Sequence, residues 1–405
     1  MTDTARTPLP PRADWLARAI ALPFHRLLDR IDAGLAAGAI EADLPDGTHR
    51  RLGGRANGPV AHVAVRRWRA LVRLATAGSI GWYEGWEAGD WTSPDPVPLF
   101  DLFMRNRRTL GSAARAGGPT RLLARIGHAL RRNDPGGARR NIAAHYDLGN
   151  AFYTEWLDPS LTYSSALFAG ADDGLEAAQR RKLASILHRT GAKAGDTLLE
   201  IGSGWGSFAA TAAAAGVSVH AITLSAEQKR RIDALALANV RCTLTDYRQV
   251  LGTYDAVASI EMVEAVGQEF WPEYLNAIAR MLRPGGRAAI QFISIDDAIF
   301  DAYGRNVDFI QRYVFPGGML IARDRFAEIA ARAGFDWQDE QRFGGDYART
   351  LRLWRERFDA AAREERLPPE FDARFVRLWR YYLMYCEGGF SGGGIDVHQV
   401  TLVRR

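Results

Sequence analysis

The residues best suited to hold a ligand lie in Glu200-Ile-Gly-Ser-Gly-Trp-Gly206, which begins inside an apolar run at residues 197–201. Glycine adopts positive φ angles easily and lets the backbone approach a ligand closely. Three glycines at alternate positions, Gly202, Gly204 and Gly206, therefore indicate a cofactor loop between a strand and a helix. The alternative interpretation is a tight turn that binds nothing.

The spacing of this loop and its acidic residue distinguish between two classes of cofactor. A dinucleotide loop has the pattern GxGxxG, with an acid near the end of the second strand for a ribose hydroxyl. Here Ser207 takes the third glycine position, and the second strand ends in Thr223-Leu-Ser225 without an acid. Glu200 would repel a pyrophosphate but attract the ammonium and sulfonium groups of S-adenosylmethionine (SAM). The loop therefore predicts SAM rather than NAD.

The elements that must position this loop alternate along the chain. Strands followed by helices predict an α/β fold with a doubly wound, mostly parallel sheet. Such sheets bind ligands outside the carboxyl ends of their strands, so the candidate residues should lie at strand ends. Strands are expected at 197–201, 217–224, 240–246, 255–261, 287–295 and 396–403, with helices up to 215 and over 225–238.

Shifts in composition divide the 405 residues into four parts. Residues 1–14 are polar and proline-rich, which predicts a disordered lead, and residues 15–110 predict a smaller α+β domain. Residues 111–140 carry seven arginines against one acid, which predicts a basic linker. The linker either contacts anionic lipid or is simply solvated. Residues 141–405 hold the α/β domain.

Composition also limits the class of protein. Two cysteines cannot staple a chain of this length, and no CxxC pair indicates a metal site, so no metal is expected. No apolar run reaches the ~18–20 residues that span a bilayer. The net charge of +5 favours an anionic partner, either lipid headgroups or nucleic acid. Residues 111–140 hold no aromatic beyond His128, which argues against nucleic acid. Because the apolar segment at residues 15–24 is too short and interrupted for a signal peptide, the expected location is the cytoplasm, at the inner face of the membrane.

Several separated motifs, in a consistent order, resemble the cyclopropane fatty acid synthase family, which includes the mycolic acid cyclopropane synthases. The resemblance covers residues 140–405 strongly and the first unit weakly. It implies a class I SAM-dependent methyltransferase fold, Rossmann-like, whose last strand runs antiparallel at the sheet edge. The motifs are His145-Tyr-Asp-Leu-Gly-Asn150, Tyr163-Ser-Ser-Ala-Leu-Phe168, the glycine loop, Thr223-Leu-Ser-Ala-Glu-Gln228, Tyr247-Arg248, Ser259-Ile-Glu-Met-Val-Glu-Ala-Val-Gly267, Gln291-Phe-Ile-Ser-Ile295, Arg312-Tyr-Val-Phe-Pro-Gly-Gly318, Gly345-Asp-Tyr-Ala-Arg-Thr-Leu351 and Tyr385-Cys-Glu-Gly-Gly-Phe390.

The same resemblance implies which residues contact SAM. Thr223 and Gln228 would replace the missing acid with neutral hydrogen bonds on the ribose side, and Tyr247-Arg248 would lie beside the adenine. The expected SAM-binding residues are Tyr163, Ser164, Glu200, Gly202, Gly204, Trp205, Gly206, Thr223, Leu224, Gln228, Asp246, Tyr247 and Arg248.

The chemistry implied by the family is attack of an alkene on the SAM methyl group, followed by loss of a proton from the resulting carbocation. The family is understood to use bound bicarbonate as the base, which Glu264 would orient, while an aromatic face such as Tyr347 stabilises the cation. Ser165 and Gln291 replace a cysteine and a histidine of the bicarbonate cage, and both can still donate hydrogen bonds. Cys386 is either a site residue or a small core side chain. The expected catalytic residues are Glu264, Tyr347, Cys386, Ser165, Gln291 and Ile293.

The expected function is therefore transfer of a carbon from SAM to the double bond of an unsaturated acyl chain in a membrane phospholipid, giving a cyclopropane. The placement of the base decides the product, so a methyl- or methylene-branched chain is the alternative. A small-molecule N-methyltransferase is more distant, and a non-catalytic lipid- or nucleic-acid-binding protein is a third class. A homodimer is left open.

Two further expectations concern the lipid. By resemblance, the first unit helps to present lipid through its motif at residues 81–91, although its Trp82, Trp86 and Trp91 are individually expected in the core. Residues 296–321 are expected to cover an apolar acyl pocket. The side chains offered for its lining are Phe300, Tyr303, Phe309 and Phe315.

Overall fold

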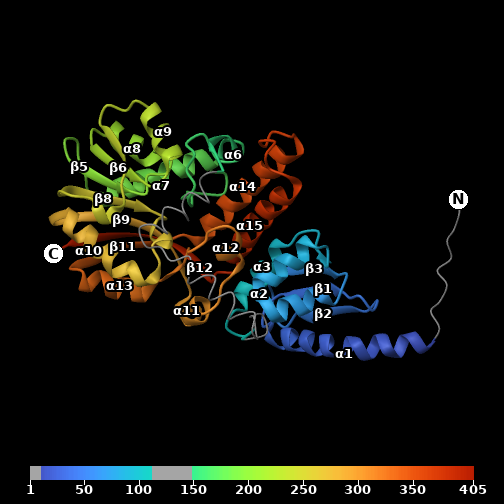
Figure 1. Cartoon of the computed structure of the whole chain (residues 1–405). Coiled ribbons are helices and arrows are strands. Elements are labelled where there is room, and N and C mark those ends of the chain that lie inside the picture. Colours follow the sequence, from blue (N-terminus) through green and yellow to red (C-terminus); the bar gives the residue numbers. More distant parts are fainter. Residues whose placement is uncertain (1–10, 112–147) are drawn as a thin grey trace. The chain divides into compact units, whose positions relative to one another are not determined.

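The computed structural model describes residues 11–111 and 148–405, with side chains from residue 21 onward. The chain divides into two compact units between residues 121 and 122, and each unit is described by itself (Figure 1). Most of the expected lead and basic linker, and also His145, lie outside the described residues. The four-part division of the chain therefore stays a prediction.

The first unit is a small α+β fold around a four-stranded sheet of order β2-β1-β3-β4. Strand β1 is antiparallel to β2 and parallel to β3. Trp82 and Trp91 are buried as expected, with stacked rings 4.3 Å apart, whereas Trp86 is partly exposed. The elements are α1 (Pro11–Gly34), β1 (Ala39–Asp43), β2 (His49–Gly53), β3 (Val60–Val65), α2 (Arg69–Glu87), β4 (Trp91–Thr92) and α3 (Val97–Arg105).

The second unit is built on a sheet of order β11-β12-β9-β8-β5-β6-β7, in which β5, β6, β7, β8 and β9 are parallel. Each predicted strand is present. The apolar runs that predicted β5, β8 and β9 are largely buried, as is usual for central parallel strands, whereas β7 lies at the sheet edge and only Cys242 in it is buried. The strands are β5 (Thr197–Ile201), β6 (Ser218–Thr223), β7 (Val240–Leu244), β8 (Tyr254–Ile260), β9 (Leu282–Ile295), β10 (Ile321–Ala322), β11 (Phe335–Arg342) and β12 (Ile395–Arg404).

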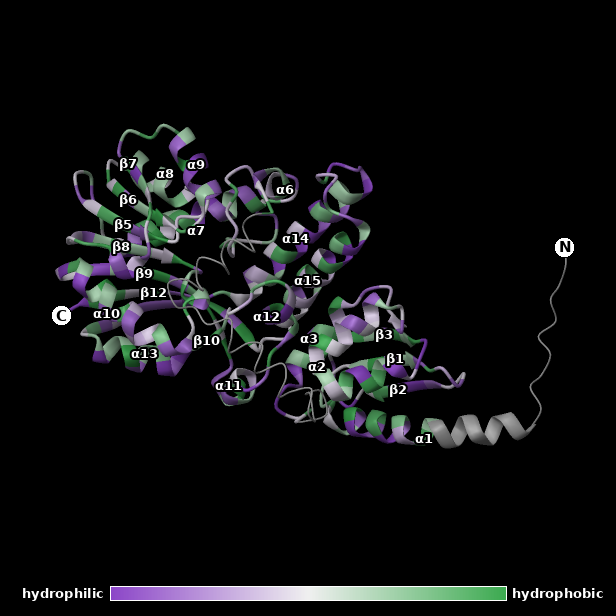
Figure 2. Ribbon diagram, in the orientation of Figure 1, coloured by the Kyte–Doolittle hydropathy of each residue, from purple (hydrophilic) through white to green (hydrophobic). Residues whose placement is uncertain are grey.

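Different helices cover the two faces of this sheet, because neighbouring side chains of a strand point to opposite faces. Leu198 packs with residues of α7, α8 and α9, whereas Leu199 packs with residues of α10 and α13 (Figure 1). In Figure 2 the central strands are mostly apolar, while hydrophilic residues gather on outer helices such as α9. The helices are α7 (Leu175–Thr190), α8 (Ser207–Ala214), α9 (Ala226–Ala234), α10 (Trp271–Met281) and α13 (Arg323–Arg332).

The last strand runs antiparallel as expected, but its place at the sheet edge was wrong. Strand β12 pairs antiparallel with both β9 and β11, so β11 forms the edge. The chain leaves β11 through two long helices and returns between β9 and β11. Strand β12 therefore has its backbone hydrogen-bonding groups paired on both sides.

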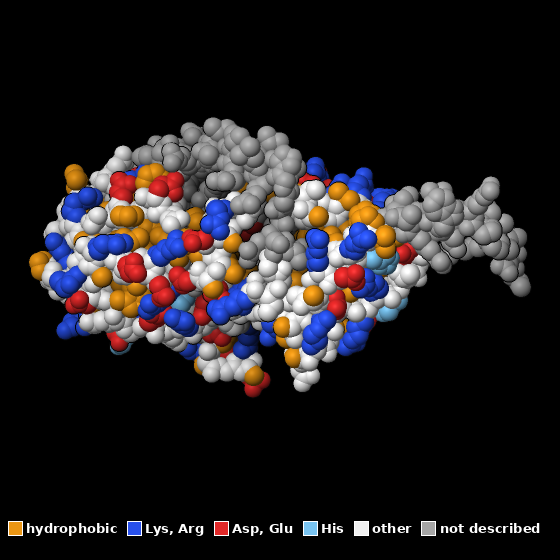
Figure 3. Space-filling view, turned by 90° about the horizontal axis from the view of Figure 1, so that it is seen from below, with side chains coloured by type: hydrophobic (Ala, Val, Ile, Leu, Met, Phe, Trp, Pro, Cys, Tyr) orange, Lys and Arg blue, Asp and Glu red, His pale blue; other side chains and the backbone are white. Residues whose placement is uncertain are grey.

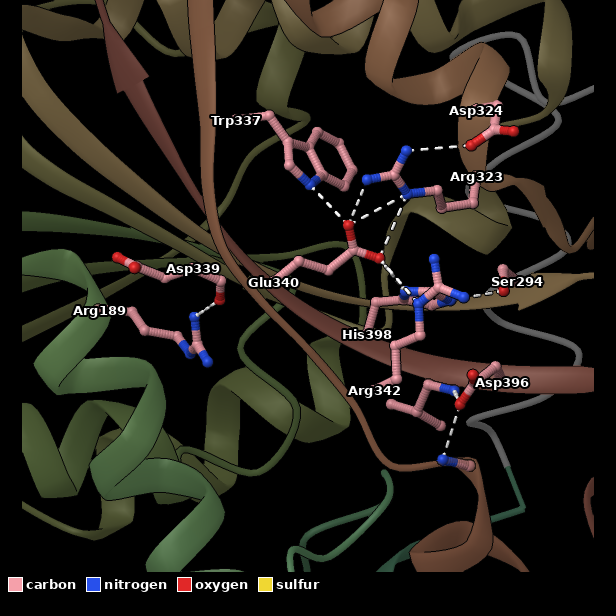
Figure 4. A network of polar contacts seen from close by, with 12 residues as sticks. Arg189, Ser294, Arg323, Asp324, Trp337, Asp339, Glu340, Arg342, Asp396 and His398 are labelled. Carbon is pink, nitrogen blue, oxygen red and sulfur yellow. Dashed lines mark hydrogen bonds and ion pairs between the residues drawn. The ribbon is translucent and has the colours of Figure 1, made fainter.

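A buried polar network ties these strands together (Figure 4). Glu340 of β11 accepts hydrogen bonds from Arg323, from Nε1 of Trp337 at 2.9 Å and from Nδ1 of His398 at 2.8 Å. The other ring nitrogen of His398 lies 2.7 Å from the Ser294 hydroxyl of β9. Burial acts to raise the pKa of Glu340, but these donors outweigh it and lower that pKa to about 2. His398 thus links β12 to both of its neighbouring strands, β11 and β9.

The remaining helices follow β9 and β11 or precede α7. Helices α14 and α15 pack against each other, and Phe152 of α6 joins them through Trp379, whose ring lies 5.0 Å away. In the segment expected to cover an acyl pocket, the ring of Phe309 lies 4.8 Å from Tyr381 of α15. These helices are α6 (Asn150–Thr154), α11 (Asp297–Gly304), α12 (Phe309–Tyr313), α14 (Gly344–Arg363) and α15 (Ala373–Ser391).

Gly344 begins α14 at a point that has no room for a side chain. A Cβ there would lie 2.7 Å from Oδ1 and 3.0 Å from Cα of Asp396, which accepts a hydrogen bond from the Gly344 N–H. We expect Gly344→Ala to lower the free energy of unfolding by about 1–3 kcal/mol, measured by urea denaturation of the full chain. The control is Gly345→Ala, because nothing lies within 4 Å of a Cβ there. An equal loss in both variants would contradict the packing argument.

Candidate active site

The glycine loop has backbone angles that favour glycine. Gly202, Gly204 and Gly206 have φ angles of 81°, 50° and 90°, and they lie between the end of β5 and the start of α8. A Cβ at Gly202 would lie 2.7 Å from Cγ of Met262, whereas nothing lies within 4 Å of a Cβ at Gly204. The loop is therefore packed on one side and leaves space at Gly204 for a ligand to meet the backbone.

Glu200 is a buried carboxylate next to this loop. Its side-chain oxygen Oε2 has no hydrogen-bond partner within the described parts of the chain. Burial raises the pKa of Glu200 well above its usual range, and the charge of Lys182 opposes this shift. A buried carboxylate oxygen without a hydrogen-bond donor is costly unless a ligand supplies one. The ammonium of SAM would supply one, so the residues present fit this cofactor.

Lys182 of α7 is a fully buried cation among several acids. Its Nζ donates a hydrogen bond of 2.5 Å to the hydroxyl of Ser164. Burial lowers the pKa of Lys182 to about 8, while the charges of Glu261, Asp158 and Glu200 act to raise it. One positive charge therefore offsets acids at two places in the site.

Tyr163 and Trp205 are held by polar contacts from separate elements. The hydroxyls of Tyr163 and Tyr382, the latter on α15, lie 2.8 Å apart. Nε1 of Trp205 donates to Oδ1 of Asn150 at 2.6 Å, and its ring lies 4.7 Å from Tyr153. The expected SAM contacts at residues 163, 164 and 205 thus have fixed side chains.

The residues expected on the ribose side follow β6. The hydroxyl of Thr223 donates to Oε1 of Gln228 at 2.6 Å, and both residues are buried. Because the amide oxygen is engaged, the Gln228 amide NH₂ is the group that can donate to a ligand. Leu224 lies between them in sequence and is half-buried.

The residues expected on the adenine side follow β7. Asp246 accepts hydrogen bonds from both the backbone N and Nε of Arg248, each at 3.0 Å. Tyr247 packs edge-on against Tyr274, with ring centroids 5.4 Å apart. Within the described residues the Tyr247 hydroxyl has no hydrogen-bond partner. The structure thus places the aromatic ring of Tyr247 and the hydrogen-bonded carboxylate of Asp246 just after the end of β7.

The side chain of Glu261 occupies the place where the resemblance implies a bound bicarbonate. Glu261, directly after β8, accepts hydrogen bonds from the Ser165 backbone N (2.9 Å), Gln291 Nε2 (2.7 Å) and the Tyr347 hydroxyl (3.0 Å). The hydroxyl of Ser165 does not take part, because it donates to the carbonyl of Ala166 at 3.0 Å. Bound bicarbonate would need the donors that Glu261 already uses, so the residues present do not fit it.

The backbone of Glu261 has a strained conformation. Its φ angle of 48° lies in a region that few non-glycine residues adopt, which costs about 1–3 kcal/mol. Its N–H donates to the carbonyl of Gln291 at 2.8 Å, so Gln291 holds it at two points. Burial raises the pKa of Glu261 above its usual value, although Lys182, the Ser165 backbone N–H and the side chains of Gln291 and Tyr347 all act to lower it.

A row of hydrogen bonds fixes the direction in which the Gln291 amide faces. Arg189 can only donate, and its Nε lies 3.2 Å from Oε1 of Gln399, which also accepts from the Ser185 hydroxyl at 2.6 Å. Nε2 of Gln399 then donates to Oε1 of Gln291 at 3.0 Å. The amide nitrogen of Gln291 is consequently left to face Glu261.

Glu264 differs from Glu261 in its surroundings. It accepts a hydrogen bond from the backbone N of Ile293, and its Oε2 has no partner within the described segments. Burial raises the pKa of Glu264 to about 8, and the charge of Glu261 adds to this shift. Near neutral pH, Glu264 is therefore mainly protonated while Glu261 has the neighbours that favour a charge. Two acids in environments this different can take different chemical roles.

Tyr347 and Cys386 lie on the helix pair beside these acids. The ring of Tyr347 is 4.5 Å from Phe390 and 6.0 Å from Trp354, so aromatic faces line this side. Cys386 is close enough to Tyr347 to affect it electrostatically. Burial raises the pKa of the Cys386 thiol, which favours its neutral form.

The sequence analysis missed three residues of this arrangement: Glu261, Lys182 and Gln399. Glu261 stands in the motif from which only Glu264 was chosen, and a second acid near a strand end was the available signal. Lys182 lies four residues from both Ala178 and Ile186, which are buried, and this spacing indicates the buried face of a helix. No sequence pattern indicated Gln399, because its partners come from distant elements.

Comparison with known proteins identifies the family. The family model "Mycolic acid cyclopropane synthetase" matches residues 134–400. The tuberculostearic acid methyltransferase UfaA1 of Mycobacterium tuberculosis is 37% identical over 414 residues, covering 96% of this chain and 92% of that protein. The cyclopropane-fatty-acyl-phospholipid synthase of Escherichia coli is 36% identical over 266 residues, covering 64% of this chain and 66% of that protein.

Solved structures agree with the fold. Mycolic acid cyclopropane synthase CmaA1, complexed with SAH and CTAB, has a TM-score of 0.61 at 30% identity, covering 66% of this chain and 98% of that one. Coclaurine N-methyltransferase has a TM-score of 0.63 at 20% identity, covering 79% and 97%, and shows the fold alone. The fold is that of class I SAM-dependent methyltransferases, and the chain belongs to the mycolic acid cyclopropane synthetase family.

Proposed function

We propose that this chain transfers one carbon from SAM to the double bond of an unsaturated fatty acyl chain in a phospholipid. The observation that carries the proposal is a carboxylate, Glu261, held against the aromatic side chain of Tyr347. Methylation of an alkene leaves a cation to stabilise and a proton to remove, which such a pair can do. An amine is a better nucleophile than an alkene, and its methylation leaves no carbocation to stabilise. This pair of residues therefore supports N-methylation less well.

SAM is the cofactor, and when bound it supplies the methyl group as an electrophile. Glu200 would accept hydrogen bonds from its ammonium, and the amide of Gln228 would donate to the ribose. Tyr247, at the end of β7, would lie beside the adenine. The buried acid with an unengaged oxygen supports the first assignment, and the engaged amide oxygen of Gln228 supports the second.

The reacting atoms would lie between the glycine loop and the aromatic side of α14 and α15. Tyr347 would present its ring to the positive charge that develops on the acyl chain. Phe309 and Phe315, against tyrosines of α15, support an apolar path for the acyl chain.

A branched acyl chain is the second candidate product. The way in which the carbocation loses its proton decides between a cyclopropane and a branched chain. Loss of a proton from the new methyl group to the adjacent cation closes the cyclopropane expected from the resemblance. A methylene branch forms when a hydride first shifts from the methylated carbon to that cation and the methyl group then loses a proton, whereas loss from a neighbouring chain carbon gives a shifted alkene. The relative that covers 96% of this chain is named a tuberculostearic acid methyltransferase, while the cyclopropane synthase covers 64%. That difference in coverage favours the branched product.

We also propose that the substrate is met at the inner membrane face, with the first unit presenting lipid and the basic linker contacting anionic headgroups. No described helix has the length and apolar character to cross a membrane. Leu22, Val60 and Val72 of the first unit are large apolar side chains exposed by 53%, 41% and 45%, which supports contact with lipid. On the described surface in Figure 3, basic and acidic side chains are interspersed, so the linker would have to supply most of the attraction.

Mass spectrometry of modified lipid tests the proposed reaction. We expect purified full-length protein, given methyl-labelled SAM and vesicles of unsaturated phospholipid, to add one labelled CH₂ unit to the acyl chain. Resistance of the product to mild hydrogenation would identify a cyclopropane, whereas uptake of hydrogen would identify a methylene branch. Vesicles of saturated phospholipid are the control. If SAM binds but no label enters lipid, a small-molecule methyltransferase becomes the better assignment.

Calorimetry with SAM tests the role of Glu200. We expect Glu200→Gln to raise the Kd for SAM about 10- to 150-fold, because a hydrogen bond to a charged group contributes about 1.5–3 kcal/mol. Glu176→Gln is the matched control, since Glu176 is an exposed acid that pairs with Arg180. Unchanged affinity in Glu200→Gln would show that the ammonium binds elsewhere.

A further inference from the structure

We propose that the carboxylate of Glu261 is the base that removes the proton in this reaction, in the place where the family resemblance implies a bound bicarbonate. The inference rests on the proposed function and concerns how the same site works. It arises from a conflict within the site, because the donors expected to hold the anion are already bonded to the protein.

The geometry gives Glu261 the position of that anion. A carboxylate and a bicarbonate both present a planar group with negatively charged oxygens. Ser165 and Gln291 donate to one oxygen of Glu261, and Tyr347 donates to the other. A separate anion would lose these three donors and meet the charge of Glu261 itself.

Glu261 still has the capacity to accept a proton. A carboxylate offers about four acceptor positions, and the hydrogen bonds above use three. Two of them lie on Oε1, so Oε2, which accepts from Tyr347, is the oxygen with more room. Glu261 is half-buried rather than enclosed, which leaves it reachable from the site.

Neighbouring residues keep this carboxylate in place and near the cofactor loop. The row from Arg189 through Gln399 prevents the Gln291 amide from turning its oxygen to Glu261. The partner residue Ser165 directly follows Ser164, whose hydroxyl binds Lys182, and Lys182 interacts electrostatically with both Glu261 and Glu200. The base and the cofactor-binding acid therefore share one buried counter-charge.

The step balances without any further reactant. The alkene electron pair forms a bond to the methyl carbon as the bond from that carbon to sulfur breaks, which leaves a neutral thioether and a carbocation on the acyl chain. Glu261 then takes a proton, and the electrons of that C–H bond close the cyclopropane or form a new double bond. The proton passes from the neutral Glu261 to solvent before the next turnover.

The first experiment uses the wild-type protein in buffer stripped of carbon dioxide, with and without added bicarbonate. We expect transfer of label to unsaturated lipid at the same rate in both. Calorimetry in the presence of SAH should detect no bicarbonate binding to the wild type. Loss of activity on stripping, restored by bicarbonate, would overturn the proposal. Absence of activity in every buffer would instead refute the proposed function, while the calorimetry would still report on the anion site.

Two variants separate the charge from the shape of Glu261. Glu261→Gln keeps the size but cannot take up a proton, and we expect kcat to fall about 10²- to 10⁴-fold with an unchanged Kd for SAM. Glu261→Gly tolerates the positive φ and empties the cage, so it should bind bicarbonate and regain activity with it. Glu176→Gln should match the wild type. Near wild-type kcat in Glu261→Gln, or no bicarbonate binding by a Glu261→Gly protein that binds SAM normally, would contradict the proposal.

Discussion

The hydrogen bonds that converge on Glu261 connect parts of the chain that are far apart in sequence. Ser165 comes from the loop before α7, Gln291 from β9 and Tyr347 from α14. A half-buried carboxylate in a strained conformation would be costly without such donors, so these three elements must be in place for Glu261 to be tolerated. The packing that starts α14 at Gly344 is thus also what delivers Tyr347 to the site.

The same region depends on one buried cation for its electrical balance. Lys182 offsets Glu200 on the side of the glycine loop and Glu261 on the side of the aromatic helices. Its Nζ is held on the hydroxyl of Ser164, so this positive charge has a fixed position between the two acids. Glu264 stands outside this balance, since burial keeps it mainly protonated.

Sequence alone predicted much of the fold, because buried parallel strands are continuous apolar runs. Strand β5 matches its predicted bounds, 197–201, and the other predicted strands differ by a few residues at their ends. The position of β12 was not predictable in this way, since strand order depends on pairing between distant segments. The glycine loop and Glu200 could be identified from the sequence because their residues follow one another in the chain. The orientation of Ser165, whose backbone rather than hydroxyl faces Glu261, depends on tertiary contacts and was not.

A crystal structure of the protein with SAH, grown in bicarbonate-containing buffer, would test most directly whether Glu261 has taken over the anion site. We expect the carboxylate of Glu261 to accept hydrogen bonds from Ser165, Gln291 and Tyr347, with no separate anion among them. A bicarbonate bound to those three groups, with Glu261 turned away, would contradict the role assigned to it.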